Sequence, residues 1–224
     1  MGTHQEVAVT PHQRSYFDAF GFLHVPGILA DDIAEITEAF EQVFAEPSNP
    51  RWKMAIPGYR NHSRVAMPDF IDRHPTLAKL ASDPRTLGVA TDLLGPGCEY
   101  VESDGNIFTC ETEWHYDTPA RAEHQHIKIS VYLDPLDHDR GAPRVMPATH
   151  LQESIRTSKL AAALGYDGAI EERLGLPGEN LPSWTVDNTP GDLIIWDFRV
   201  LHASYGSLEP RRLISMNFRA AGRT

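Results

Sequence analysis

The feature that most constrains the fold of this chain is a change of hydrophobic period near Tyr100. The segment "HIKISVYLD", which begins at His126, alternates strictly between apolar residues and polar or aromatic ones. Strict alternation places the two kinds of side chain on opposite faces of a strand. Further short strands are predicted in "GAPRVMP", "SWTVD", "DLIIWD", "RVLHAS" and "RLISMNFR", which are separated by Gly, Pro, Asp and Asn. Many short strands with turns between them are typical of a sandwich or jelly roll.

The first half of the chain is dominated by predicted helices. Thr10 and Pro11 begin a short helix, which is followed by a predicted strand at residues 22–25. The segment "ADDIAEITEAFEQVFAEP" has apolar residues near helical spacing and ends at Pro47. Two more short helices are predicted between residues 74 and 95, with a break at Asp83-Pro84. The segment "RWKMAIPGYRNHSRVAMPDF" is interrupted by Pro and Gly and is predicted to be a loop.

Helices followed by strands predict an α+β fold. We expect a double-stranded β-helix, that is, a jelly-roll or cupin-like barrel, buttressed by the N-terminal helices. At 224 residues the chain suits one domain over residues 1–224, helix-rich at 1–97 and with a jelly-roll core at about 98–220. A domain of this size buries enough surface to hold a desolvated site.

Composition and charge exclude several classes of partner. A formal net charge of −11 argues against nucleic acid, which is bound through Lys and Arg on its phosphates. The first residues show no targeting segment and no apolar run approaches a membrane span, so we expect no membrane partner. Cys98 and Cys110 form no disulfide framework and fit the reducing cytoplasm, where we expect the protein to act. A small-molecule substrate is the expected partner, and the sequence leaves the oligomeric state open.

The segment "EWHYDTPA", residues 113–120, carries a candidate metal-binding pair. His115 and Asp117 are two positions apart, so on a strand both side chains point to the same side. One His-x-Asp pair is expected by chance in such a chain, so the pair needs support from elsewhere. His202 in "RVLHASYG" is the best-placed third ligand. Two His and one carboxylate are typical of non-haem Fe(II) oxygenases, and the absence of a thiolate cluster argues against structural zinc.

Four segments in order resemble one family. "FDAFGFLHVPGILADDIAEI", "EWHYD", "KISVYLDPLDHDRGAPRVMPATH" and "TPGDLIIWDFRVLHASYGSLEPRRLIS" are similar to the phytanoyl-CoA dioxygenase family of Fe(II)/2-oxoglutarate oxygenases. The resemblance covers most of the chain, and the separation of 87 positions from His115 to His202 fits it. It implies that His115, Asp117 and His202 bind Fe(II) and are catalytic, and that 2-oxoglutarate and O₂ are cosubstrates. It also implies oxidation of an unactivated C–H bond, most simply hydroxylation, with release of succinate and CO₂, possibly in specialised metabolism. Retention of Asp117 argues against a halogenase.

The resemblance also implies a site for the distal carboxylate of 2-oxoglutarate. Arg211, nine residues after His202, is the predicted anchor, and by strand alternation its neighbour Arg212 points the other way. Ser204 matches a hydroxyl that binds the same carboxylate. Further predicted cofactor contacts are Asn106 and Lys128. A plain surface salt bridge at Arg211, with Arg212 or Arg199 in its role, is the alternative.

Several other residues have weaker assignments. Predicted contacts with an anionic substrate come from Arg60, His62 and Arg64 in "GYRNHSR", although a solvated loop explains them equally well. The metal-like spacing of His124 and His126 is read as a solvated loop. Two tryptophans, Trp184 and Trp196, are predicted to be core.

Two functions from other classes stay open at this point. A cupin-like isomerase or hydrolase would use the metal without 2-oxoglutarate. A jelly-roll binding protein would keep the barrel and do no catalysis, although the intact ligand set argues against it.

Overall fold

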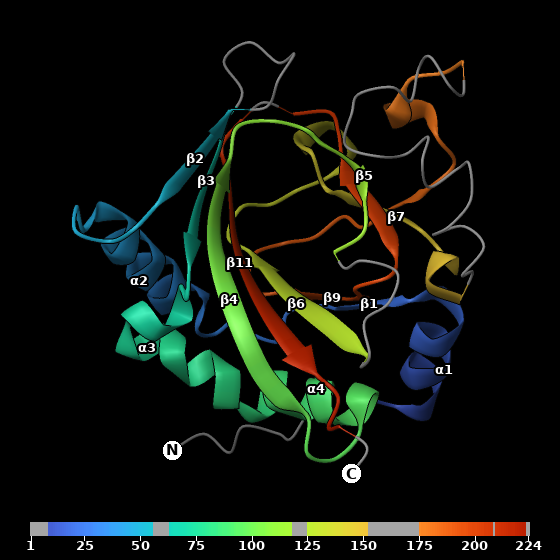
Figure 1. Ribbon diagram of the computed structural model, residues 1–224, viewed down its shortest axis with the longest axis horizontal. Coiled ribbons are helices and arrows are strands. Elements are labelled where there is room, and N and C mark those ends of the chain that lie inside the picture. Colours follow the sequence, from blue (N-terminus) through green and yellow to red (C-terminus); the bar gives the residue numbers. More distant parts are fainter. Residues whose placement is uncertain (1–8, 56–62, 118–124, 152–174, 208, 223–224) are drawn as a thin grey trace.

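Two antiparallel sheets form the body of the computed structural model, which describes residues 9–55, 63–117, 125–151, 175–207 and 209–222. The larger sheet has seven strands in the order β1-β9-β6-β11-β4-β3-β2, and the smaller has four in the order β5-β10-β7-β8 (Figure 1). This architecture confirms the predicted jelly roll. The strands are β1 Phe22–Val25, β2 Trp52–Ala55, β3 Ser63–Pro68, β4 Glu99–Phe108, β5 Thr112–His115, β6 His126–Tyr132, β7 Pro143–Met146, β8 Trp184–Thr185, β9 Leu193–Asp197, β10 Leu201–Ser204 and β11 Arg211–Arg219.

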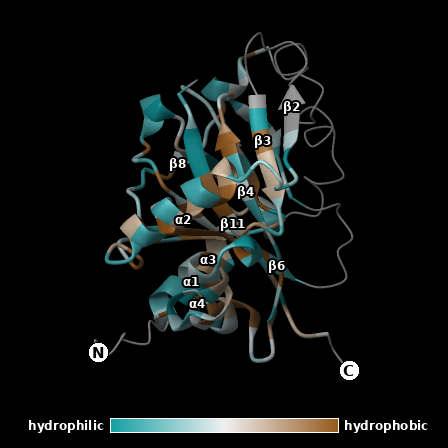
Figure 2. Ribbon diagram, turned by 90° about the vertical axis from the view of Figure 1, so that its left-hand side faces the viewer, coloured by the Kyte–Doolittle hydropathy of each residue, from teal (hydrophilic) through white to brown (hydrophobic). Residues whose placement is uncertain are grey.

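Among the described residues, four α-helices pack against the face of the larger sheet that carries the main core. They are α1 Pro11–Phe20, α2 Ile33–Ala45, α3 Pro75–Ala78 and α4 Pro84–Leu94. The alternating residues of β6 divide as predicted, since Ile127, Ile129 and Val131 are fully buried in the core shared with the helices. The polar face of the same strand therefore points into the barrel. Figure 2 shows α1, α3 and α4 gathered together, with hydrophobic stretches in the central strands beside them.

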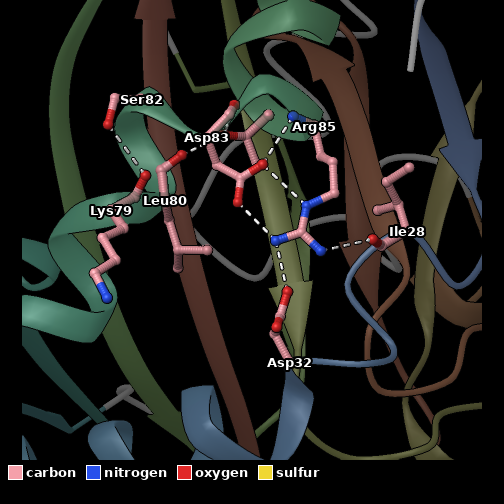
Figure 3. A network of polar contacts seen from close by, with 8 residues as sticks. Ile28, Asp32, Lys79, Leu80, Ser82, Asp83 and Arg85 are labelled. Carbon is pink, nitrogen blue, oxygen red and sulfur yellow. Dashed lines mark hydrogen bonds and ion pairs between the residues drawn. The ribbon is translucent and has the colours of Figure 1, made fainter. Parts of the chain in front are cut away.

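Two helices begin at boundaries that the sequence predicts, Thr10-Pro11 and Asp83-Pro84. The Thr10 hydroxyl accepts a hydrogen bond from the Gln13 amide, and Pro11 occupies the first turn. The Asp83 carboxylate caps α4 and also binds the Arg85 guanidinium at 2.6 Å (Figure 3). Arg85 reaches Asp32, next to the start of α2, at 2.5 Å and donates to the carbonyl of Ile28. This network ties α4 to the segment that leads into α2. Among the described residues, no helix is long and apolar enough to cross a bilayer.

The prediction that residues 51–70 form a loop is wrong at both ends of that segment. β2 and β3 pair with each other, and β3 adds to β4, so the first 97 residues contribute three strands to the larger sheet. Met67 is fully buried in the main core, which fixes the register of β3. Pro57 and Gly58 lie in residues 56–62, outside the described residues. This adjacent Pro and Gly interrupt the strand pattern at positions 57 and 58, so they do not predict a loop over all of residues 51–70.

The two tryptophans predicted to be core differ. Trp196 is 3% exposed and packs in the second hydrophobic cluster, as predicted. Trp184 is 61% exposed, so the prediction for it is wrong. It lies on β8, a two-residue strand at the edge of the smaller sheet, where no further strand of the described residues covers it.

Candidate metal centre

The three predicted metal ligands meet at the pairing of β5 with β10. His115 ends β5 and lies directly opposite His202 on β10. Asp117 follows two residues later, and its amide donates to the carbonyl of Phe198 at 2.9 Å. One ligand atom from each of the three residues lies within 4.8 Å of the others. Within the described part of the chain, the fold therefore brings together the predicted 2-His-1-carboxylate set.

Each histidine is oriented by its own backbone. Nδ1 of His115 lies 2.7 Å from the carbonyl of Glu113, and Nδ1 of His202 lies 3.1 Å from the carbonyl of Val200. A carbonyl at Nδ1 fixes the tautomer that presents Nε2 to a metal. Nε2 of His202 indeed faces Asp117, 3.7 Å from its Oδ2. Both rings are thus set for coordination through Nε2.

Two residues outside the ligand set hold Asp117. Lys128, on the inner face of β6, donates from Nζ to Oδ1 at 2.7 Å. Trp196, on β9, donates from Nε1 to Oδ2 at 3.2 Å and stacks on the His202 ring at a centroid distance of 4.8 Å. Hydrogen-bond donors of this kind orient a ligating carboxylate. Lys128 is predicted to contact the cosubstrate; in this structure its partner is Asp117.

The protonation states suit metal binding. Burial lowers the pKa of His115 to about 3; His202 adds to the lowering and Asp117 opposes it. Burial also lowers the pKa of His202, against the attraction of Asp117. Burial alone raises the pKa of Asp117, but Lys128 and the two histidines outweigh it, so this pKa lies well below its usual range. Neutral imidazole and ionised carboxylate are the forms that coordinate a metal.

The predicted carboxylate anchor lies in the interior, next to the predicted hydroxyl. Arg211 is 3% exposed, and its Nη1 donates to the Ser204 hydroxyl and, at 2.6 Å, to the carbonyl of Gly141. Its Nη2 donates to the carbonyl of Cys110, whereas its buried Nε has no partner among the described residues. A guanidinium has five N–H donors, so donors remain for an anion. Arg211 and Ser204 are therefore suited to bind a carboxylate group.

The two alternative arginines are committed elsewhere. Arg212 points away from the barrel, as predicted, and pairs with Asp134 at 2.6 Å and Glu41 at 2.7 Å. Arg199 pairs with Asp197 at 2.6 Å. Neither contact leads toward Ser204, which leaves Arg211 as the arginine beside it.

The remaining predicted residues are only partly placed. Asn106 is 1% exposed, and its Oδ1 accepts from Nε of Arg64 at 2.8 Å, while the Arg64 guanidinium lies 5.3 Å from the Phe108 ring centroid. The predicted substrate role of Arg64 stays a prediction. Arg60, His62 and His124 lie outside the described residues. His126 begins β6 and pairs in register with Arg219, so it belongs to a strand and not to a loop.

Sequence reasoning missed three residues that shape the site. Trp196 was assigned only to the core, although it also holds Asp117. Gly141 has φ +77°, and a Cβ there would lie 2.6 Å from Nη1 of Arg211, so only glycine allows this close approach. Tyr132 is buried, and burial raises the pKa of its phenol to about 12 against the opposing charge of Arg211. The alternation of "HIKISVY" and "LIIWD" was the available signal for Tyr132 and Trp196.

Comparisons with known proteins agree with this geometry. A family model described as phytanoyl-CoA dioxygenase (PhyH) matches residues 17–213. The chain belongs to the phytanoyl-CoA dioxygenase family. The predicted family is thus confirmed, and with it a 2-oxoglutarate-dependent class of oxygenase whose expected cofactors are Fe(II) and 2-oxoglutarate. A search of curated proteins gave no significant match.

Several solved structures have a similar fold. The non-heme alpha ketoglutarate dependent carbocyclase SnoK from nogalamycin biosynthesis has a TM-score of 0.74 and 19% identity, over 98% of this chain and 87% of that one. HygX from Streptomyces hygroscopicus, crystallised with nickel and 2-oxoglutarate, has a TM-score of 0.71 and 19% identity, over 97% and 90%. EctD from S. alaskensis, crystallised with 2-oxoglutarate and 5-hydroxyectoine, has a TM-score of 0.71 and 21% identity, over 96% and 78%. At these identities the likeness establishes the fold.

Proposed function

We propose that this family member is an Fe(II)- and 2-oxoglutarate-dependent dioxygenase that hydroxylates an unactivated C–H bond of a small molecule. The observation that carries the proposal is the joint presence of two sites in one barrel. One is the cluster of His115, Asp117 and His202, and the other is the buried pair of Arg211 and Ser204. A metal enzyme without the cosubstrate would need only the first. Within this family, a buried cation beside a hydroxyl fits the distal carboxylate of 2-oxoglutarate.

The chain's own residues would divide the work. His115, Asp117 and His202 would hold the ion and leave positions open for ligands. Lys128 and Trp196 would keep Asp117 oriented, and the stacked indole would exclude water from one side of His202. With Fe(II) bound, the site would supply the chemistry that couples R–H, O₂ and 2-oxoglutarate to R–OH, succinate and CO₂.

The cosubstrate would be positioned by contacts on β10 and β11. Arg211 would bind its distal carboxylate, and the Ser204 hydroxyl, which like Arg211 donates to the Gly141 carbonyl, would turn its one proton to the carboxylate instead. Tyr132, protonated and buried, and Asn106 line the same inner face of the barrel. These groups would fix one end of the molecule so that the other end meets the metal. Desaturation, epimerisation or ring closure would use the same residues, and SnoK is described as a carbocyclase.

The test is an anaerobic titration of the metal-free protein, first with Fe(II) and then with 2-oxoglutarate, followed by visible absorption. A weak charge-transfer band is expected in the wild type. The band should be lost in His115→Ala and Asp117→Ala and weakened in Arg211→Ala. His138→Ala, whose side chain is 66% exposed, and Arg212→Ala serve as matched controls. Iron binding without a charge-transfer band would refute the use of 2-oxoglutarate as cosubstrate. An Asp117→Ala variant that turned over 2-oxoglutarate at the wild-type rate would refute the proposed metal site.

A further inference from the structure

Polar side chains form two rows across the inner face of the larger sheet. β4, β11 and β6 are neighbours in that sheet (Figure 1). Asp104 on β4 lies opposite Ser215 on β11, which lies opposite Ser130 on β6. In the next row, Asn217 lies opposite both Glu102 and Lys128. Residues opposite one another in antiparallel strands have Cα atoms about 4.5–5.5 Å apart, so each row shares one face.

This face is the one that looks toward the metal ligands. Lys128, in the second row, binds Asp117 directly. Ser103, the neighbour of Asp104 along β4, points the opposite way, since its hydroxyl accepts from the amide of Ile71 on the helical side. Asp104 therefore lies on the same face as Lys128, where it is partly exposed, and Glu102 on the same side of β4 is exposed. We call Glu102, Asp104, Ser130 and Asn217 the acceptor wall.

The acceptor wall has hydrogen-bonding capacity that the described residues leave unused. Ser130 is fully buried, and its hydroxyl has no partner in the described chain. Asn217 is 5% exposed; its Nδ2 donates to Glu102 at 3.1 Å, and its Oδ1 has no partner there either. Asp104 accepts no hydrogen bond from a described residue. Buried polar groups are normally satisfied, so unpaired ones in an active-site barrel point to a ligand.

The cations closest to the wall are held by other groups. Lys128 is hydrogen-bonded to Asp117, and Arg64 is hydrogen-bonded to Asn106 and lies over Phe108. Burial raises the pKa of the Asp104 carboxyl above its usual range, and the opposing pull of Arg64 and Lys128 does not cancel the shift. The ionised form of Asp104 thus lacks full compensation, and an added positive charge would stabilise it.

We propose that the acceptor wall binds a protonated amino group of the primary substrate, so that the substrate class is the cationic amines. An ammonium group carries three donors and no acceptor, which matches a surface of carboxylate, amide and hydroxyl oxygens. A substrate carboxylate would meet like charges at Asp104 and Glu102. The inference rests on the proposed oxygenase function, because the wall lies on the same inner face as Lys128, which binds Asp117 of the proposed metal site.

The experiment measures the binding of three probes of equal shape to the full chain loaded with Zn(II) and 2-oxoglutarate, by ligand-observed NMR. The probes are cyclohexylamine, cyclohexanol and cyclohexanecarboxylate. We expect the amine to bind in the millimolar range and at least about tenfold more tightly than the other two. Asp104→Asn should remove this preference without changing the binding of the alcohol, and Ser130→Ala should reduce it. Asp104→Glu should keep the preference. Asp139→Asn, whose side chain is 94% exposed, is the matched control and should have no effect.

The preference among charges separates a ligand contact from a structural role, because loosening of the fold would weaken all three probes together. The proposal is overturned if cyclohexanecarboxylate binds best, if the amine does not bind, or if Asp104→Asn keeps the amine preference. The Fe(II) and 2-oxoglutarate titration is run on the same proteins. A normal charge-transfer band without amine preference removes the subsite and leaves the oxygenase proposal intact. If the charge-transfer band is absent but amine binding still depends on Asp104, the oxygenase proposal is removed and the amine subsite remains.

Discussion

Replacement of Arg211 tests the carboxylate anchor most directly. The guanidinium is 3% exposed, and each hydrogen bond from a charged group contributes about 1.5–3 kcal/mol. A bidentate contact with 2-oxoglutarate would therefore be worth at least about 3 kcal/mol, and each 1.4 kcal/mol is about a factor of ten in affinity. Arg211→Gln should weaken 2-oxoglutarate binding by roughly 100-fold or more. Arg211→Lys, which keeps the charge but loses the fork, should weaken it by roughly tenfold.

The assay is the anaerobic titration of Fe(II)-loaded protein with 2-oxoglutarate, with urea unfolding in parallel. Arg211→Gln also loses the hydrogen bonds to Gly141 and Cys110, so a loss of stability is expected. Arg212→Gln provides the control, because it removes ion pairs to Asp134 and Glu41 on the outside of the sheet. It should lower stability without changing 2-oxoglutarate affinity. The assignment would be refuted if Arg211→Gln bound 2-oxoglutarate within about threefold of the wild-type affinity. It would also be refuted if Arg211→Gln and Arg212→Gln lost equal amounts of 2-oxoglutarate affinity.

Three further changes have defined outcomes. In the metal-free protein, burial lowers the pKa of His115 to about 3 in the folded state, whereas the unfolded state has the ordinary histidine pKa, so the unfolded state takes up the proton first as the pH falls. Between pH 7 and 5.5 the free energy of unfolding of the wild type should therefore fall by about 1 kcal/mol more than that of His115→Gln. Urea titration at the two pH values measures this difference. Trp196→Phe keeps a ring against His202 but removes the donor to Asp117, and Fe(II) affinity measured by titration should fall at least about tenfold; an unchanged affinity would make the indole merely core. Gly141→Ala should displace the Arg211 guanidinium and weaken 2-oxoglutarate binding at least about tenfold with Fe(II) binding unchanged, and a loss of both would indicate general misfolding instead.

The clustering of His115, Asp117 and His202, the proposed metal ligands, was partly accessible to sequence reasoning because the spacing of two of them follows from a local rule. The i, i+2 spacing puts His115 and Asp117 on one side of a strand whatever the rest of the chain does. His202 required the order of motifs as well, since strand pairing is not encoded locally. Arg211 and Arg212 were separated correctly by alternation alone.

The contacts across the barrel were not accessible in the same way. Periodicity predicts that Lys128 points inward, but it does not say which residue on another strand it meets, and the partner proved to be Asp117. The role of Trp196 was hidden for the same reason. The prediction that Trp184 is buried was wrong because the burial of a strand residue depends on a neighbouring strand, and β8 lies at the edge of its sheet.

The direct pairing of His115 with His202 has a consequence for how the protein matures. The two residues are 87 positions apart, so the coordination set exists only after most of the barrel strands have been made and β10 has found β5. Contacts of such long range form late and slowly in folding. A slip of one residue in that pairing would turn the facing side chains to the other side of the sheet. We therefore expect iron to bind only after the barrel has closed. The bound ion would then stabilise the register of β5 against β10, on which the coordination set depends.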